Sequence, residues 1–343
     1  MIDVVIVGGG PVGLAAAIEA RLAGLTVTVV EPRTSPIDKA CGEGLMPGAL
    51  PLLGKLGVHP VGHPLLGVGY YAAARRVEHH FSNGCGLGVR RTVLHEALAE
   101  RAAALGVNHI AGRADAIEQH EDSVTVVVGT SRIDARWLFG CDGLHSSIAR
   151  LVGLARPPRP GDRRYGIRQH FALSPWSSLI EVHYGPTAEL YVTPVAADVV
   201  GVAMLAPQGT SFGAALASVP DVADRLAGVA VASERRGAGP FRQRTRARTA
   251  GRVLLIGDAS GYVDALTGEG LRLGFAQASA AVASVVDGRP GRYESEWRRV
   301  TRDFRMLTTG LVAWADSPFR GALVPTAARL PGVFGAVVER LAR

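Results

Sequence analysis

Three short stretches of the chain are almost entirely apolar, and each runs directly into a glycine. They read IDVVIV at residues 2–7, WLF at 137–139 and VLLI at 253–256. Uninterrupted apolar runs rich in β-branched residues are typical of parallel strands that are covered on both faces. We therefore expect these three segments to be strands of one buried sheet.

Helical periodicity lies between these strands. An Ala-rich helix is expected over residues 11–22, and LTVTVVE at 25–31 predicts the strand that follows it. An amphipathic helix is expected near residues 92–104, and a long Ala-rich helix starts near Gly270. Strands that alternate with helices in this way indicate an α/β fold with an open, largely parallel sheet.

Two other regions have different patterns. Residues from about 156 to 244 show the alternation of strands but contain no nucleophile–base pair and no metal-ligand cluster. From about residue 291 onward the chain is helical and apolar with a basic end. This last segment is compatible with a cover for the core, with a lipid-facing surface or with a dimer contact.

Composition limits the class of protein. The 343 residues are 48% hydrophobic and 20% charged, with a mean hydropathy of +0.19, so a large core is expected and broad disorder is not. No apolar run reaches the roughly 18 residues that a membrane span needs. The start MIDVVIVGGG has no basic region typical of a signal peptide, which favours a cytoplasmic location.

The net charge of +7 does not by itself indicate nucleic-acid binding. Nearly all of it is arginine, scattered along the chain except for RQRTRAR at 242–248, which has no aromatic residues between its charges. The three cysteines, Cys41, Cys85 and Cys141, form no CxxC pair, and the histidines show no ligand spacing. Neither a disulfide framework nor a metal site is expected.

The first strand leads into a dinucleotide-binding motif. GGGPVG supplies Gly8, Gly10 and Gly13 of a G-x-G-x-x-G sequence, and the second strand ends at the acidic residue Glu31. The glycines allow a tight turn, a close approach to a pyrophosphate and close packing of helix on strand, while the glutamate can accept hydrogen bonds from a ribose. The complete strand–helix–strand–Glu unit predicts a dinucleotide site, without separating NAD from FAD.

Two later motifs favour a flavin. Cys141-Asp142-Gly143 ends one apolar strand, and Gly257-Asp258 ends another. Together with the first motif and in this order, they resemble the flavoprotein monooxygenases of the para-hydroxybenzoate hydroxylase type. They resemble still more closely the related geranylgeranyl reductases and flavin-dependent halogenases.

The resemblance implies a Rossmann-like FAD-binding domain with an interleaved antiparallel substrate sheet and C-terminal helices. It also implies non-covalent FAD and, because only one dinucleotide fold is present, NAD(P)H as a transient reductant. We expect the FAD-binding domain in residues 1–70, 86–155 and 245–290, the substrate-binding sheet in 71–85 and 156–244, and a C-terminal helical segment in 291–343.

The resemblance also assigns site residues. In this family the arginine before the second helix contacts the FAD phosphates, the first Asp supports the pyrophosphate and the approach of nicotinamide, and the second Asp binds the ribityl hydroxyls. The residues expected to bind the cofactor are Gly8, Gly10, Pro11, Val12, Gly13, Glu31, Pro32, Arg33, Cys41, Gly42, Arg91, Asp142, Gly143, Gly257, Asp258, Gly268, Glu269, Gly270 and Leu271.

The tetrapeptide Gly-Glu-Gly-Leu occurs twice, at 42–45 and at 268–271, in flanks that do not match. It is therefore not a repeated unit. In related flavoproteins both segments reach the isoalloxazine, so both are expected to be glycine-rich backbone against one planar ring, where side chains would collide. The second copy, at a helix N-terminus, could also stabilise negative charge on the reduced flavin.

The substrate side is less defined. AELYVTPVAADVVGVAML resembles a substrate-sheet strand in which an aromatic residue and a proline face the flavin, which points to Tyr191 and Pro194, although core packing explains both equally well. The catalytic lysine of the halogenases has no counterpart, since neither Lys39 nor Lys55 lies in this segment. Halogenation is therefore disfavoured.

Three functions remain. The first is an NAD(P)H-dependent monooxygenase that uses dioxygen, through a flavin C4a-hydroperoxide, to hydroxylate or epoxidise an apolar or aromatic small molecule. The second is a C=C reductase of a prenyl-like or polyketide substrate, with Cys41 or Tyr191 as proton donor. The third is a non-catalytic lipid-binding escort on the same fold. We favour monooxygenation, and peripheral membrane contact stays open.

Overall fold

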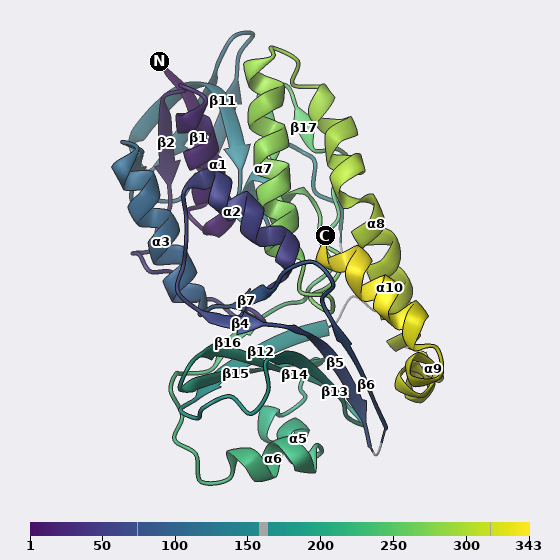
Figure 1. Ribbon diagram of the computed structural model, residues 1–343. Helices are drawn as coiled ribbons and strands as arrows, with labels where there is room; N and C mark the ends of the chain where they lie inside the picture. Colours follow the sequence, from purple (N-terminus) through teal and green to yellow (C-terminus); the bar gives the residue numbers. More distant parts are fainter. Residues whose placement is uncertain (74, 158–163, 316) are drawn as a thin grey trace.

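The computed structural model describes residues 1–73, 75–157, 164–315 and 317–343. Two sheets are stacked one above the other in the view of Figure 1, with helices α1, α3, α7 and α8 around the upper sheet and α5 and α6 beneath the lower one. The α/β class expected from the sequence is confirmed.

The upper sheet has eight strands, with the order β17-β18-β11-β1-β2-β8 and with β10 and β9 attached to β11. β1 pairs in parallel with both β2 and β11, and β11 pairs in parallel with β18. The three apolar segments of the sequence therefore lie side by side. The strands are β1 (Ile2–Val7), β2 (Val27–Val30), β8 (Asn108–Ile110), β9 (Ala116–Gln119), β10 (Val124–Val128), β11 (Ser131–Gly140), β17 (Thr249–Ala250) and β18 (Val253–Leu255).

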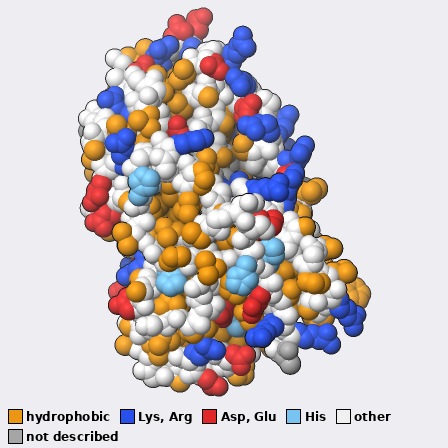
Figure 2. Space-filling model, in the orientation of Figure 1, with side chains coloured by type: hydrophobic (Ala, Val, Ile, Leu, Met, Phe, Trp, Pro, Cys, Tyr) orange, Lys and Arg blue, Asp and Glu red, His pale blue; other side chains and the backbone are white. Residues whose placement is uncertain are grey.

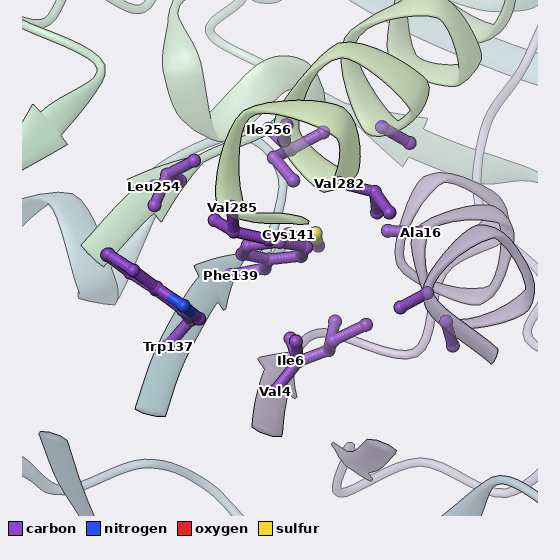
Figure 3. Close-up of a cluster of buried hydrophobic side chains, with 14 of the residues drawn as sticks. Val4, Ile6, Ala16, Trp137, Phe139, Cys141, Leu254, Ile256, Val282 and Val285 are labelled. Atoms are coloured by element: carbon purple, nitrogen blue, oxygen red, sulfur yellow. The ribbon is translucent and has the colours of Figure 1, made fainter. Parts of the chain in front are cut away.

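Helices α1 and α7 cover one face of this sheet. Figure 3 shows Ile6, Phe139 and Ile256 from neighbouring strands against Ala16 of α1 and Val282 of α7. Small alanines let α1 approach the strands closely, and the cluster excludes water from both elements. The helices of this lobe are α1 (Pro11–Leu22), η1 (Pro47–Ala49), α2 (Leu50–Leu56), α3 (Arg91–Ala104), α4 (Ser147–Leu151), η2 (Gly257–Ser260), α7 (Gly270–Val286) and α8 (Arg292–Ala315).

The lower sheet has seven strands in the order β16-β12-β15-β14-β13-β5-β6, all antiparallel except for the β13–β5 pair. It begins at Gly67 rather than at residue 71, where we had expected the substrate sheet to begin. Its strands are β5 (Gly67–Ala72), β6 (Arg75–His80), β12 (Arg164–Phe171), β13 (Leu179–Tyr184), β14 (Glu189–Ala196), β15 (Val199–Pro207) and β16 (Arg236–Ala238).

Smaller elements complete the two lobes. A three-stranded sheet, β3 (Gly44–Leu45), β7 (Gly86–Gly88) and β4 (His63–Leu65), lies between them. Helices α5 (Phe212–Ala217) and α6 (Pro220–Leu226) bury Phe212 and Val222 against one face of the seven-stranded sheet. The other face is left for the upper lobe.

The C-terminal segment packs on the edge of the lower sheet. It contains η3 (Arg320–Ala322), α9 (Leu323–Arg329) and α10 (Pro331–Ala342). Phe334 meets Tyr70 of β5 edge to face at 4.9 Å, so the inner side of α10 is core. Within the described residues no single helix is both long enough and apolar enough to cross a membrane. The segments Arg320–Arg329 and Pro331–Ala342, which are bent by 105° relative to each other, reach the required length and apolarity only when they are taken together.

Candidate functional site

A cavity lies where the two sheets face each other. Its upper wall is formed by the segments that follow β1, β11 and β18, and its lower wall by strands of the seven-stranded sheet. On the face in Figure 2, hydrophobic side chains gather in a band across the middle of the molecule, between the two lobes. The carboxyl ends of parallel strands are where open α/β sheets bind their ligands.

The glycines of the first motif divide into two groups. A Cβ at Gly13 would lie 1.8 Å from the Gly8 carbonyl oxygen, and a Cβ at Gly8 (φ +110°) would lie 2.4 Å from the Cys141 carbonyl oxygen. These two positions therefore permit the turn and the helix–strand contact, and they do not line the cavity. Gly10, Pro11 and Val12 do line it, at the N-terminus of α1.

Positive charge surrounds this helix terminus. Arg91 lines the cavity, its Nη2 would be 3.6 Å from a Cβ at Gly10, and its buried Nε has no hydrogen-bond partner among the described residues. Lys39 also lines the cavity, and its Nζ would lie 3.5 Å from a Cβ at Gly143. A helix N-terminus flanked by two such cations is a site for an anion such as a pyrophosphate.

Lys39 is a site residue that the sequence analysis missed, because it was considered only as a halogenase lysine. Burial lowers its pKa, the Asp258 carboxylate opposes that shift, and the charges of Arg91 and Arg33 reinforce it. Its position two residues before Cys41 in DKACGEG was the signal that could have found it.

Glu31 lies beside the cavity rather than on its wall. Its carboxylate is buried and accepts hydrogen bonds from the Gly9 N–H at 2.8 Å and from Arg33 Nε at 2.7 Å. Burial acts to raise the pKa of Glu31, but the hydrogen bonds from Arg33 and Gly9 outweigh it and the pKa lies below its ordinary value. Pro32 is exposed and does not line the cavity, whereas Arg33 does.

The two aspartates after the strands differ in their surroundings. Asp142 caps α4, since its carboxylate accepts hydrogen bonds from Ser147 N at 2.6 Å and from Ile148 N at 3.1 Å. The half-buried Asp258 lines the cavity, and within the described residues its carboxylate accepts no hydrogen bond. Burial raises the pKa of Asp258, while the charges of Lys39 and Arg91 oppose the rise. Asp142 also lines the cavity, but its carboxylate is held by α4, whereas the Asp258 carboxylate is not held by any hydrogen bond from the described residues.

Both copies of Gly-Glu-Gly-Leu reach the same cavity. Gly42 and Gly268 line it, and a Cβ at either position would meet no atom within 4 Å, so both face open space. Gly270, Leu271 and Gly44 also line the cavity.

The acidic residue of the second copy points elsewhere. Glu269 is 1% exposed, does not line the cavity and pairs with Arg272. Burial raises the pKa of Glu269 to about 7, although Arg272 acts to lower it.

The lower part of the cavity is an apolar chamber. Its walls come from the seven-stranded sheet, from α10 and from neighbouring loops, and its apolar lining includes Met46, Val68, Tyr70, Ile180, Val182, Ala203, Leu205, Phe241, Leu266, Val338 and Leu341. Arg168 and Glu43 also line the cavity, but the many aliphatic and aromatic side chains of this set favour an apolar occupant. Leu144 and Tyr262 also line the cavity.

Tyr191 lines this chamber, but its hydroxyl is already used. It donates to the Leu266 carbonyl at 3.0 Å, and burial raises its pKa well above the ordinary value. Pro194 does not line the cavity, whereas Thr193 does. Successive side chains of a strand point to opposite faces, so Tyr191 and Thr193 share a face that Pro194 cannot share.

Cys41 is half-buried on the cavity wall, and its Sγ accepts a hydrogen bond from the Glu43 N–H at 3.4 Å. Cys85 is exposed and Cys141 is buried at the end of β11. Among the described residues no three His, Cys, Asp or Glu side chains are grouped to hold a metal ion.

Comparison with known proteins gives one family and several relatives. A family model described as "FAD binding domain" matches residues 1–211. A rifampicin monooxygenase of Streptomyces venezuelae is 34% identical over 171 residues, which are 47% of this chain and 36% of the relative. A 12-dehydrotetracycline 5-monooxygenase/anhydrotetracycline 6-monooxygenase of Streptomyces rimosus subsp. rimosus is 30% identical over 333 residues, 80% of this chain and 61% of the relative. The chain thus spans less than two thirds of the length of these two relatives.

A flavoprotein/dehydrogenase of Cytophaga hutchinsonii has the same fold, with a TM-score of 0.86, 19% identity, and coverage of 99% of this chain and 92% of that one. At this identity the likeness concerns the fold alone. The cavity offers the cations of Arg91 and Lys39 near a helix N-terminus, open glycine backbone at Gly42 and Gly268, and the Asp258 carboxylate, which accepts no hydrogen bond from the described residues. These features suit a flavin dinucleotide. With a match over residues 1–211 of 343, this chain belongs to the FAD binding domain family.

Proposed function

We propose that this protein is an FAD-dependent monooxygenase acting on an apolar, aromatic small molecule. The observation that carries the proposal is one continuous cavity with two unlike halves. Arg91 and Lys39 stand at the N-terminus of α1 in one half, and the other half is an apolar chamber. A dinucleotide fits the charged half and an apolar substrate fits the chamber beyond it.

The residues of the charged half have distinct roles in holding FAD. The cations of Arg91 and Lys39, with the N–H groups of α1, would hold the pyrophosphate. The Asp258 carboxylate would accept hydrogen bonds from sugar hydroxyls, worth roughly 1.5–3 kcal/mol each. Glu31 would take a ribose hydroxyl once Arg33, which now donates to both of its oxygens, moves aside. Gly42 and Gly268 leave space for a planar ring.

FAD supplies the redox chemistry when bound. In the overall reaction NAD(P)H provides a hydride, solvent provides a proton, one oxygen atom of O₂ enters the substrate and the other leaves as water. The protein's own contribution is to place the substrate and to exclude water from the chamber, which strengthens electrostatic interactions there. Because the Tyr191 hydroxyl is bound to a backbone carbonyl, we assign it a positioning role rather than proton donation.

The two relatives support a polycyclic aromatic substrate, because their names refer to rifampicin and to tetracycline intermediates. The chamber of this chain, with Tyr70 and Phe241 in its wall, suits compounds of that type. NAD(P)H would bind only transiently, since β1, α1 and β2 form the dinucleotide unit already assigned to FAD.

The cofactor is tested first. Purified protein is expected to be yellow and to release FAD on denaturation, and Asp258→Ala and Arg91→Met are expected to bind FAD more weakly without unfolding. Glu100→Gln, on the exposed side of α3, is the control. A colourless protein that takes up no added FAD would refute the proposal and favour the non-catalytic escort.

The reaction is tested with labelled dioxygen. Anthracycline-like and tetracycline-like aromatics are added with NADPH or NADH, and substrate-stimulated oxygen uptake with label in the product is expected. Turnover without oxygen that yields a product heavier by two hydrogens would replace this proposal with a C=C reductase.

A further inference from the structure

A buried cluster of charged and polar side chains joins the two lobes beside the cavity. It consists of Asp38 and Glu43 from the segment before β3, Arg168 and His170 from β12, and Ser233. Arg168 and His170 are each 1% exposed and Glu43 is 3% exposed. Buried charges are retained in folded proteins only where they are paired, so the arrangement of this cluster is informative.

Arg168 is the centre of the cluster. Its Nη2 donates to the Asp38 carboxylate, its Nε lies 3.8 Å from Glu43 Oε1, and its Nη1 lies 3.2 Å from His170 Nδ1. Arg236 also donates to Asp38, at 3.2 Å. Arg168 therefore faces both Asp38 and Glu43, whereas Arg236 is shared between Asp38 and the exposed Glu234.

The contacts also determine the tautomer of His170. A guanidinium N–H can only donate, so Nδ1 accepts from Arg168 and the ring proton lies on Nε2. Nε2 then donates to Glu43 Oε2 at 2.5 Å. Ser233 Oγ lies 2.8 Å from Nδ1, so Ser233, His170 and Glu43 resemble a serine–histidine–glutamate triad. Ser233 Oγ, however, donates to the Glu234 carbonyl at 3.1 Å, so the serine is not arranged as a nucleophile that His170 would activate.

Glu43 links the cluster to the anion-binding side of the cavity. Its Oε1 accepts the Arg91 N–H at 2.8 Å, at the N-terminus of α3, and its backbone has the left-handed φ of +59°. A left-handed φ is costly for a residue with a side chain, so the surroundings must hold it in place. The hydrogen bonds to His170 and Arg91 do so.

Asp38 and Glu43 flank the four residues Lys39–Gly42, all of which line the cavity. Each flanking carboxylate is bound to β12, whose residues Gly166–Arg168 line the same cavity from the other lobe. We propose that Arg168, His170 and Glu43 are positioning residues: they clamp the segment Lys39–Gly42 to β12 and so set the position and redox environment of the bound flavin. This inference rests on the proposed FAD site.

The clamp is tested by a double-mutant cycle. Arg168→Met leaves two buried carboxylates short of a partner, and Glu43→Gln leaves the arginine short of one. We expect each single variant to bind FAD at least roughly tenfold more weakly and to shift the flavin midpoint potential. The double variant removes one charge of each sign, so it should recover part of the loss, because residues in contact are not additive.

Arg236→Met is the matched control, since Arg236 contacts Asp38 but neither Glu43 nor His170. It should leave the FAD affinity and the flavin midpoint potential close to those of wild type. Urea midpoints identify any variant that has lost its fold. Strictly additive effects, or equal effects of Arg168→Met and Arg236→Met, overturn the inference.

A second measurement needs no cofactor. Hydrogen exchange of the amides of residues 39–43 should be faster in Arg168→Met than in wild type and Arg236→Met, and unchanged exchange there also overturns the clamp. If the wild type itself binds no FAD, the proposed function fails, and the exchange result still decides whether the clamp exists.

Discussion

The burial of Glu269 predicts how the free energy of unfolding depends on pH, in both direction and size. The side chain is 1% exposed at the N-terminus of α7, its Oε1 has no hydrogen-bond partner among the described residues, and Arg272 is its ion-pair partner. Burial penalises the charged carboxylate, and it outweighs the attraction of Arg272. The folded protein therefore holds a proton on Glu269 that the unfolded chain would release.

The pKa of Glu269 rises from an ordinary value of 4.5 to about 7 in the folded state. A group with a raised pKa stabilises the fold fully below its unfolded pKa, and that contribution is lost as the pH rises through the folded pKa. The stabilising contribution of Glu269 is therefore lost between about pH 4.5 and pH 7. At roughly 1.4 kcal/mol per pKa unit, the loss of stability as the pH rises from 4.5 to 7 is roughly 3 to 4 kcal/mol.

The assay is urea denaturation of wild type and Glu269→Gln at several pH values between 5 and 8, with FAD saturating. The neutral amide cannot ionise, so the free energy of unfolding of the variant, relative to wild type, should increase with pH by up to about 3 kcal/mol. Glu100→Gln, an exposed carboxylate on α3, should run parallel to wild type. Arg272→Met should strengthen the pH dependence, because it removes the only cation paired with Glu269 within the described residues. Parallel curves for wild type and Glu269→Gln would refute the reasoning.

Three further predictions concern the cavity and its turn. Gly13→Ala should unfold the protein or leave it insoluble, because the new Cβ would lie 1.8 Å from the Gly8 carbonyl oxygen. Gly42→Ala should keep the urea midpoint of wild type, because its Cβ would have no atom within 4 Å. A fluorescence titration should show that this second variant has lost FAD affinity. Tyr191→Phe should lower the free energy of unfolding by about 1 kcal/mol and leave the pH profile of turnover unchanged; a displaced profile would show that the hydroxyl is a proton donor. Cys41→Ser should retain FAD, and loss of the flavin absorbance on gel filtration would contradict this.

The strands, helices and turn glycines of the upper lobe could be predicted from the sequence because each depends on neighbouring residues. Apolar runs such as residues 2–7 mark buried strands, and Gly13 is required by its contact with the Gly8 carbonyl within a single turn. Placing Asp258 in the cavity also followed, since strand ends in a parallel sheet meet at one edge.

The tertiary structure decided everything that depends on residues far apart in the chain. The sequence did not indicate that Lys39 lines the cavity or that Glu269 is buried away from it. Nor did it show that Arg168 joins the segment before β3 to β12. Periodicity along the chain specifies which faces are buried, but pairing of charges and the register of strands depend on how the two sheets meet, and that contact is made only on folding.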